Sequence, residues 1–223
     1  INNVRQGADI TPRTRFWLEN AKDFVDSPGE WYFDKKEHLI YYYPNVNETA
    51  DNIEMYYGLT DSVLRIEGNS KQHISDIEIS GIEFRNTGWT RPNNEGFLSL
   101  QGNSLLPSDL DSAKDERYRM GIKKEKIPGV IDSAYGDNIT IENCSFINTA
   151  ANAITLEVGG NDINIKNNVF TNIGGTAIEV GGDYYKSNDG DMFHKNINIY
   201  NNYFDAIAQT YRGGVGILVR YAD

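Results

Sequence analysis

The chain has 223 residues, of which 39% are hydrophobic, enough for a core of ordinary size. Its 21 Lys and Arg against 32 Asp and Glu give a formal net charge of −11, which repels a phosphate backbone and excludes nucleic acid as an expected partner. The sequence contains no apolar run of about 18 residues, so it predicts no membrane span. The single cysteine, Cys144, excludes an internal disulfide or a cysteine-based zinc cage.

Residues 1–70 predict a small N-terminal α/β cap or side domain. Arg15–Asp26 is a candidate short helix that ends at Ser27-Pro28-Gly29. The two aromatic runs that follow, Glu30–Asp34 and His38–Pro44, predict a β-hairpin. We expect this segment to cover one end of the structure that follows it.

The second half of the chain contains an internal repeat with the template Ile-x-Ile-x-(Gly/Asn)-x-x-Phe. The phenylalanines are 62, 24 and 34 residues apart, which indicates a unit of about 24 residues with insertions of varying length. Four segments match the template: Ile77–Phe84, Ile139–Phe146, Ile163–Phe170 and Ile197–Phe204.

Each repeat alternates Ile-x-Ile with a period of two, which is typical of a strand. Asn143, Asn167 and Asn201 stand where the chain must turn, and a second short strand follows in two units, Ala153–Val158 and Thr176–Val180. A unit this short cannot bury its own apolar face and must stack on its copies. We therefore predict an all-β fold, a right-handed parallel β-helix over residues 71–223 in which the asparagines form a ladder, with a β-sandwich as the alternative.

A long interruption at residues 89–129 separates the first two repeats. It contains one candidate strand, Gly96–Gly102, and a charged stretch, Asp109–Lys126, that is typical of a surface excursion.

Several segments in order along the chain resemble the right-handed parallel β-helix (pectin-lyase-like) family of bacterial carbohydrate-active enzymes. The resemblance implies a secreted or periplasmic glycoside hydrolase acting on plant or microbial polysaccharides, with fucosidase, xylosidase and galactosidase activities among its relatives. The segments that carry it are Glu19-Asn20, Ser27–Asp34, Leu39–Pro44, Thr87–Pro92, Pro128-Gly129, Val169–Gly175 and Tyr211–Ile217.

The chain departs from this family pattern at its end. In the family the coil continues for several more rungs, whereas this chain stops at Asp223. The chain also opens on Ile1 rather than Met, which indicates a processed or trimmed N-terminus. We expect a C-terminally incomplete coil, some of whose catalytic residues lie outside the sequence.

Two glutamates are candidates for the carboxylate pair that glycoside hydrolysis needs, with the carboxyl groups about 5 Å apart for retention or about 6.5–9.5 Å apart for inversion. Glu157 and Glu179 each lie between two apolar residues just before Gly-Gly, so we predict that they stack on neighbouring rungs. Their repulsion requires a cation, a shared proton, or an arginine such as Arg220 or Arg212. The alternative is a pair of solvated surface glutamates.

A second acidic group lies in the ten-residue insertion that lengthens the last repeat. It comprises Asp183, Asp189 and the predicted catalytic Asp191, beside Tyr185 and His194, which we predict to bind substrate. A polar turn without a ligand and a calcium site are the alternatives for this group.

Four residues in loops that follow a repeat phenylalanine are predicted to bind substrate: Trp89, Arg91, Tyr211 and Arg212. Core packing explains Trp89 equally well.

Three functions are compatible with these residues. The leading prediction is a glycosidase acting on a polysaccharide or oligosaccharide along a lateral face of the coil, with no required cofactor. A polysaccharide lyase needs a basic residue and a cation such as calcium, and the negative charge disfavours its acidic substrate. A non-catalytic glycan-binding coil would present aromatic residues without a close carboxylate pair.

Overall fold

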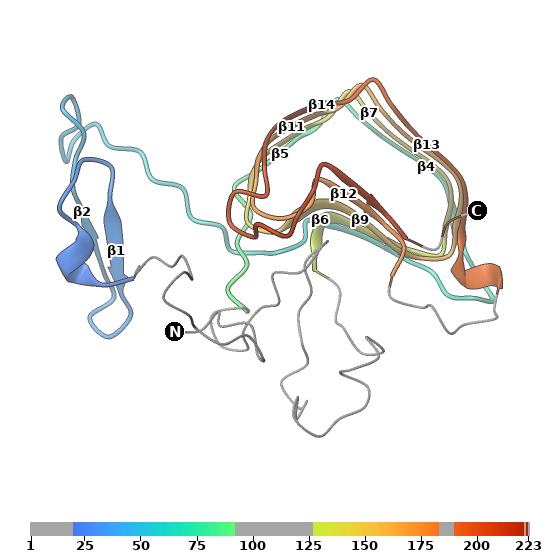
Figure 1. The fold of residues 1–223 in the computed structure, drawn as a ribbon, viewed down its shortest axis with the longest axis horizontal. Helices are drawn as coiled ribbons and strands as arrows, with labels where there is room; N and C mark the ends of the chain where they lie inside the picture. The colour runs from blue at the N-terminus through green and yellow to red at the C-terminus, as the bar shows by residue number, and fades with distance from the viewer. Residues whose placement is uncertain (1–19, 92–126, 183–189, 221, 223) are drawn as a thin grey trace, which may run out of the picture. The chain divides into compact units, whose positions relative to one another are not determined.

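The computed structural model describes residues 20–91, 127–182, 190–220 and 222. Two compact units divide the chain: Ala8–Tyr56 forms one, and Tyr57–Asp223 with Ile1–Gly7 forms the other. Figure 1 shows the second unit as a coil of stacked strands. None of the helices described is long and apolar enough to cross a membrane.

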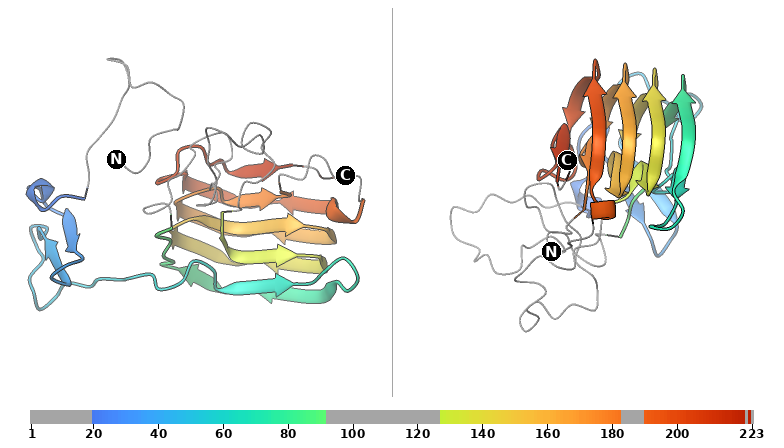
Figure 2. Two further views of the ribbon diagram at one scale, coloured as in Figure 1. Left: turned by 90° about the horizontal axis from the view of Figure 1, so that it is seen from below. Right: turned by 90° about the vertical axis from the view of Figure 1, so that its right-hand side faces the viewer.

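The coil consists of three parallel sheets, and each turn of the chain contributes one strand to each sheet (Figures 1 and 2). Sheet I contains β4 (Ile74–Ser80), β7 (Gly136–Glu142), β10 (Gly160–Lys166) and β13 (His194–Tyr200). Sheet II contains β5 (Glu83–Arg85), β8 (Ser145–Thr149), β11 (Val169–Ile173) and β14 (Tyr203–Ile207). Sheet III contains β3 (Leu64–Glu67), β6 (Gly129–Ala134), β9 (Asn152–Val158), β12 (Ile178–Val180) and β15 (Ile217–Val219).

The predicted all-β parallel β-helix is confirmed by this topology. Strands that follow one another along the chain belong to different sheets, and each pairs in parallel with its counterpart one turn away. A β-sandwich would instead join antiparallel neighbours by hairpins. Sheet III begins with β3, which pairs with β6, so the coil starts before residue 71 and the predicted boundary lies too late.

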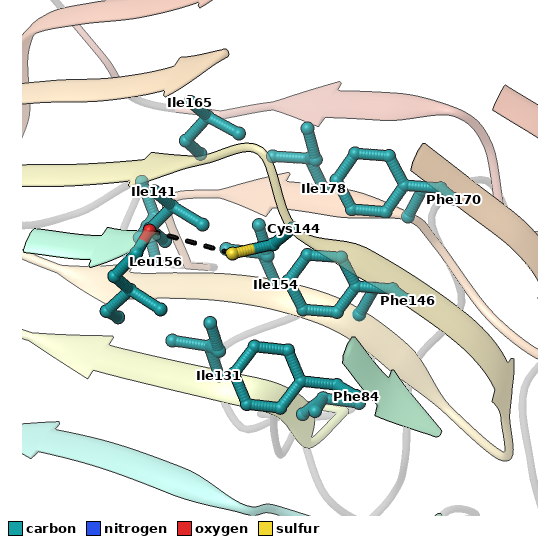
Figure 3. Packing of buried hydrophobic residues seen from close by; sticks show 14 of the residues in the cluster. Phe84, Ile131, Ile141, Cys144, Phe146, Ile154, Leu156, Ile165, Phe170 and Ile178 are labelled. Atoms are coloured by element: carbon teal, nitrogen blue, oxygen red, sulfur yellow. Dashed lines mark hydrogen bonds between the residues drawn. The ribbon is translucent and has the colours of Figure 1, made fainter. Parts of the chain in front are cut away.

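Apolar columns fill the interior of the coil. The rings of Phe84, Phe146, Phe170 and Phe204 stack nearly parallel, with successive centroids 5.1, 4.9 and 5.0 Å apart. These separations match the interstrand spacing of about 4.8 Å, because each ring belongs to the next strand of sheet II. Figure 3 shows the phenylalanines packed beside isoleucines from sheet III. Full burial of each such side chain contributes about 1.5–3 kcal/mol.

The bend between sheets I and II is built from asparagine. Asn143, Asn167 and Asn201 all have a left-handed backbone, with φ between 53° and 58°, a conformation that asparagine tolerates better than most residues. The Asn201 side-chain amide donates to Asn167 Oδ1 at 2.6 Å. The predicted ladder is confirmed at these last two rungs. A second, buried rung lies inside the bend, where Asn168 Oδ1 accepts from the backbone N–H of Cys144 at 2.9 Å.

A second asparagine ladder is formed by the residues that stand two positions after each stacked phenylalanine. Asn148 donates to Asn86 at 3.2 Å, and Asn172 donates to Asn148 at 2.8 Å. The next residue in the column is Ala206, which has the same left-handed backbone, with φ of 51°. An alanine in this conformation costs about 1–2 kcal/mol and contributes no hydrogen bond to the ladder.

The unit Ala8–Tyr56 contains the predicted aromatic hairpin. After a single 3-10 turn, η1 (Lys22–Phe24), β1 (Trp31–Asp34) pairs antiparallel with β2 (Leu39–Tyr42). The Tyr32 and Tyr41 rings stack across the two strands, and Lys22 Nζ lies 3.7 Å from the Tyr41 ring centre. The hairpin is confirmed. Of the predicted helix at 15–26, only η1 is helical among the residues described.

Two further predicted segments, the strand at 96–102 and the charged stretch at 109–126, lie outside the described residues.

Candidate functional site

A column of polar side chains runs along the outward side of sheet III. Thr155 pairs with Asp132 on one neighbouring strand and with Glu179 on the other. The residues that precede them, Ile131, Ile154 and Ile178, point into the core (Figure 3), so strand alternation turns the polar residues the other way. All three are nevertheless buried: Asp132 is 3% exposed, Thr155 2% and Glu179 6%. We call these three residues the polar column.

A hydrogen-bond network holds the column in place. The buried Asn152 amide donates to Glu179 Oε2 at 2.7 Å and to Thr155 Oγ1 at 3.2 Å. Its own oxygen accepts from the Thr176 backbone N–H at 2.8 Å. Asn152 can satisfy both its donors and its acceptor only in this orientation, so it fixes the Glu179 carboxylate relative to Thr155.

An ion pair and a backbone hydrogen bond also contact the two carboxylates. Arg220 Nη1 lies 3.4 Å from Glu179 Oε1, so one of the arginines predicted to compensate this glutamate does so. Asp132 Oδ1 accepts from the backbone N–H of Gly129 at 2.8 Å. Carboxylates this deeply buried are costly unless they are paired or hydrogen-bonded, and these contacts provide that compensation.

The separation of the two carboxylates follows from the register. Asp132 and Glu179 lie on strands two positions apart in sheet III, with Thr155 between them. Two interstrand spacings place their backbones about 9.5 Å apart. This backbone spacing lies at the upper end of the range of about 6.5–9.5 Å between carboxyl groups that admits a water molecule beside a sugar.

Glu157 does not stack on Glu179, so the predicted register of this pair is wrong. Glu179 lies opposite Thr155, and Val180 lies opposite Leu156. On its other side, β9 pairs Leu156 with Ser133 and Val158 with Ala134, which leaves Glu157 as the extra residue of a β-bulge. Thr155 stands four residues before the Gly159-Gly160 pair, whereas Glu179 stands two residues before Gly181-Gly182, so counting back from the glycines misplaces the register by two residues.

Asp132 was missed by the sequence analysis, although its signal is present. The run Val130-Ile131-Asp132 resembles Ala153-Ile154-Thr155 and Ala177-Ile178-Glu179, in which a small or branched residue and an isoleucine precede the polar position. Thr155 and Glu179 also follow their repeat phenylalanines, Phe146 and Phe170, by the same interval. This interval is a better guide to register than the glycines.

Two predicted residues of the second acidic group, Asp191 and His194, differ in burial. Asp191 lies in the short η2 helix (Gly190–Met192) and is exposed. His194 is 1% exposed, and its Nε2 lies 3.1 Å from the Leu156 carbonyl oxygen. Burial lowers the pKa of His194 to about 4, so the ring is neutral inside the coil at ordinary pH. Tyr185, Asp183 and Asp189 lie outside the described residues.

The aromatic residues predicted to bind substrate form a small core of their own. Trp89 and Tyr211 pack edge to face, with ring centres 5.0 Å apart, and both are buried with Ile127 and Ala151. The Ile127 carbonyl accepts a hydrogen bond from Thr155, which connects this cluster to the polar column. Core packing, the alternative for Trp89, is what the structure shows, while Arg91 and Arg212 are exposed.

The described residues contain no group of three His, Cys, Asp or Glu side chains placed to hold a metal ion. The calcium alternative for the acidic insertion therefore stays a prediction, since most of that insertion lies outside the described ranges.

Comparisons with known proteins agree with the fold. A family model described as the GH141 insertion domain matches residues 8–45, inside the unit that contains the aromatic hairpin. A solved structure titled "Glycoside hydrolase" superposes with a TM-score of 0.80 at 22% identity, covering 91% of this chain and 37% of the other. The chain thus spans little more than a third of that protein, and at this identity the likeness shows the fold alone. A search of curated proteins gives no match.

The expected resemblance to parallel β-helix carbohydrate-active enzymes is confirmed at the level of the fold by this superposition.

Proposed function

We propose that the chain forms the catalytic coil of a glycoside hydrolase that inverts the anomeric centre and acts at the polar column. The observation that carries the proposal is the pair of buried carboxylates, Asp132 and Glu179, two rungs apart on one lateral face of the coil. Such a spacing suits hydrolysis through a water molecule held between the groups.

The surroundings of each carboxylate suggest its role. Glu179 has the Arg220 guanidinium and the Asn152 amide beside it, and both favour a carboxylate that carries its negative charge. An ionised group suits the general base that activates water. Asp132 is then the general acid that protonates the leaving oxygen. Elimination by a lyase would require a free basic side chain as the base, whereas Arg220 is paired with Glu179.

The name of the structural relative and the family model at residues 8–45 both point to carbohydrate chemistry. A plant or microbial polysaccharide or its oligosaccharides is therefore the proposed substrate. Because such polymers are met outside the cytoplasm, we further propose that the protein is secreted or periplasmic.

Reducing-sugar release across a panel of plant and microbial glycans tests the proposal. Glu179→Gln and Asp132→Asn should each lower kcat by about 10²- to 10⁴-fold, because each removes one proton-transfer group. Asp205→Asn changes an exposed carboxylate on β14 and serves as the matched control. Proton NMR of the first anomer released should show inversion. Full activity in both site variants would refute the assignment, and loss of activity only in Asp191→Asn would move the site to η2.

A further inference from the structure

We propose that the bend after β6 is a binding subsite for a neutral pyranose unit of a glycan chain. The subsite consists of Tyr135 with His73, Asp137 and Asn161, and we call it the Tyr135 corner. The inference rests on the proposed function only for the direction in which the glycan runs, because binding at this corner can be measured whether or not the protein hydrolyses anything.

Tyr135 occupies a backbone position that rarely accepts an aromatic residue. Its φ is +53°, in the left-handed region, where the described residues of the coil otherwise have Gly, Asn, Asp or Ala. A Tyr in this region is a strained choice that the surrounding structure must hold in place, and strained residues of this kind gather at functional sites.

Glycines on both neighbouring rungs lie against Tyr135. A Cβ on Gly159 would lie 2.6 Å from Tyr135 Cδ1, and a Cβ on Gly68 would lie 3.1 Å from Tyr135 Cβ. Backbone carbonyl oxygens lie closer still: Asp191 O would be 2.5 Å from a Cβ on Gly159, and Tyr135 O 2.7 Å from a Cβ on Gly68. The close approach of the backbone therefore requires glycine at both positions, and at Gly159 the same glycine leaves space for the Tyr135 ring.

A fixed hydrogen-bond chain stands beside this ring. His73 Nδ1 lies 2.9 Å from Asp137 Oδ2, while Asp137 Oδ1 accepts from both the backbone N–H and the side-chain amide of Asn161, each at 2.9 Å. Partial burial raises the pKa of Asp137, but the hydrogen bonds from His73 and Asn161 outweigh it, and the pKa lies below its usual value. An ionised Asp137 makes His73 Nδ1 the donor and leaves Nε2 for another partner.

The corner offers these groups to solvent. The His73 and Tyr135 rings meet edge to face with centres 5.3 Å apart, and the side chains of His73 and Asp137 are 23% and 31% exposed. Among the residues that the structure describes, neither the Tyr135 hydroxyl nor His73 Nε2 has a hydrogen-bond partner. Such an arrangement suits a sugar, because the aromatic ring can stack on the apolar face of the sugar ring while the fixed polar groups bind its hydroxyls.

The position of the corner relates it to the polar column. Asp132 lies in β6 and Tyr135 directly follows that strand, three residues or about 10 Å further along the chain. A glycan held at the column and extended along the strands would therefore reach the corner with a later sugar unit. The carboxylate of Asp137 and the net charge of −11 favour a neutral sugar over a uronate.

Histidine NMR provides the direct test, because the chain has only three histidines, His38, His73 and His194. Methyl pyranosides of xylose, galactose, fucose and glucose are titrated in turn, and His73→Gln assigns the His73 ring signal. At least one sugar should shift the His73 signal and leave those of His38 and His194 in place. Absence of a His73 shift with all four sugars would overturn the proposal.

Tyr135→Gly is the decisive variant, since glycine suits the backbone and removes the ring. It should weaken the binding of that sugar about fivefold to tenfold while thermal unfolding shows a fold at least as stable. Tyr200→Ala, which removes an exposed tyrosine from β13, should leave the affinity unchanged. Equal affinity in Tyr135→Gly and the parent would overturn the proposal.

The two proposals fail separately. Normal hydrolysis with no His73 shift refutes the subsite alone, and a His73 shift without hydrolysis of any glycan refutes the proposed function alone.

Discussion

Sheets I and III are built from the same rungs, yet their outward side chains differ in character. On sheet I the outward column of Glu78, Thr140, Asn164 and Asn198 is exposed or half-buried, and the register with β7 and β10 is unbroken. On sheet III the polar column, which lies on the three central strands, is buried, contains two carboxylates and is flanked by a bulge at Glu157. One repeat can therefore provide a regular scaffold on one side and a specialised polar surface on another.

We expect the largest loss of stability from a substitution in the interior of the coil, against which both sheets pack. Phe146→Ala should lower the free energy of unfolding by about 3–5 kcal/mol, because the ring is fully buried between two others. Phe204→Ala, in the half-buried last ring of the stack, should cost about half as much. Denaturant unfolding measures both. Equal losses would show that the stack is not tightest at its centre.

The acid stability of the coil depends on His194, the first residue of β13 in sheet I. The pKa of His194 is about 4 in the fold and 6.5 when unfolded, so the unfolded chain binds the extra proton between these values. The resulting stabilisation is complete above pH 6.5 and declines by about 3 kcal/mol as the pH falls to 4. Urea unfolding at several pH values measures it. His194→Asn should lose this part of the pH dependence, and an unchanged profile would contradict the assignment.

Both outward columns contain a threonine, so the same substitution can be made on sheet III and on sheet I. Thr155→Ala on sheet III removes the partner of Asn152 and the donor to Ile127, and should cost about 1–2 kcal/mol. Thr140→Ala on sheet I should cost less than about 0.5 kcal/mol, since surface changes rarely do more. Thermal unfolding of both variants provides the measurement. Similar costs would remove the distinction between the two sheets.

The smallest expected effect is a gain in stability at the bend after β14. Ala206→Asn should stabilise the coil by about 1 kcal/mol, because asparagine tolerates the left-handed backbone and can donate to Asn172, as Asn172 donates to Asn148. The melting temperature reports the change. A lower value would show that the ladder ends at Asn172 for a reason other than the missing side chain.

The repeat made most of the fold predictable, because each template position maps to one column. Phe146, Phe170 and the asparagines after each Ile-x-Ile occupy the predicted places. Sheet III was harder to predict because β9 is longer than β12, so a register counted from the glycines that follow them is wrong by two residues. The partnership of Asn152 with Glu179 joins residues 27 positions apart and depends on that register, so no local pattern reveals it.

The number of residues between hydrogen-bonded asparagines shows how readily one turn of the coil accepts an insertion. Asn86 and Asn148 bond across 62 residues of chain, whereas Asn148 and Asn172 bond across 24. Closing the longer loop costs only about 0.8 kcal/mol more in chain entropy, because the cost grows with the logarithm of loop length. A lineage can thus lengthen one turn of the coil by dozens of residues at little thermodynamic penalty, provided that the rungs on either side still meet in register.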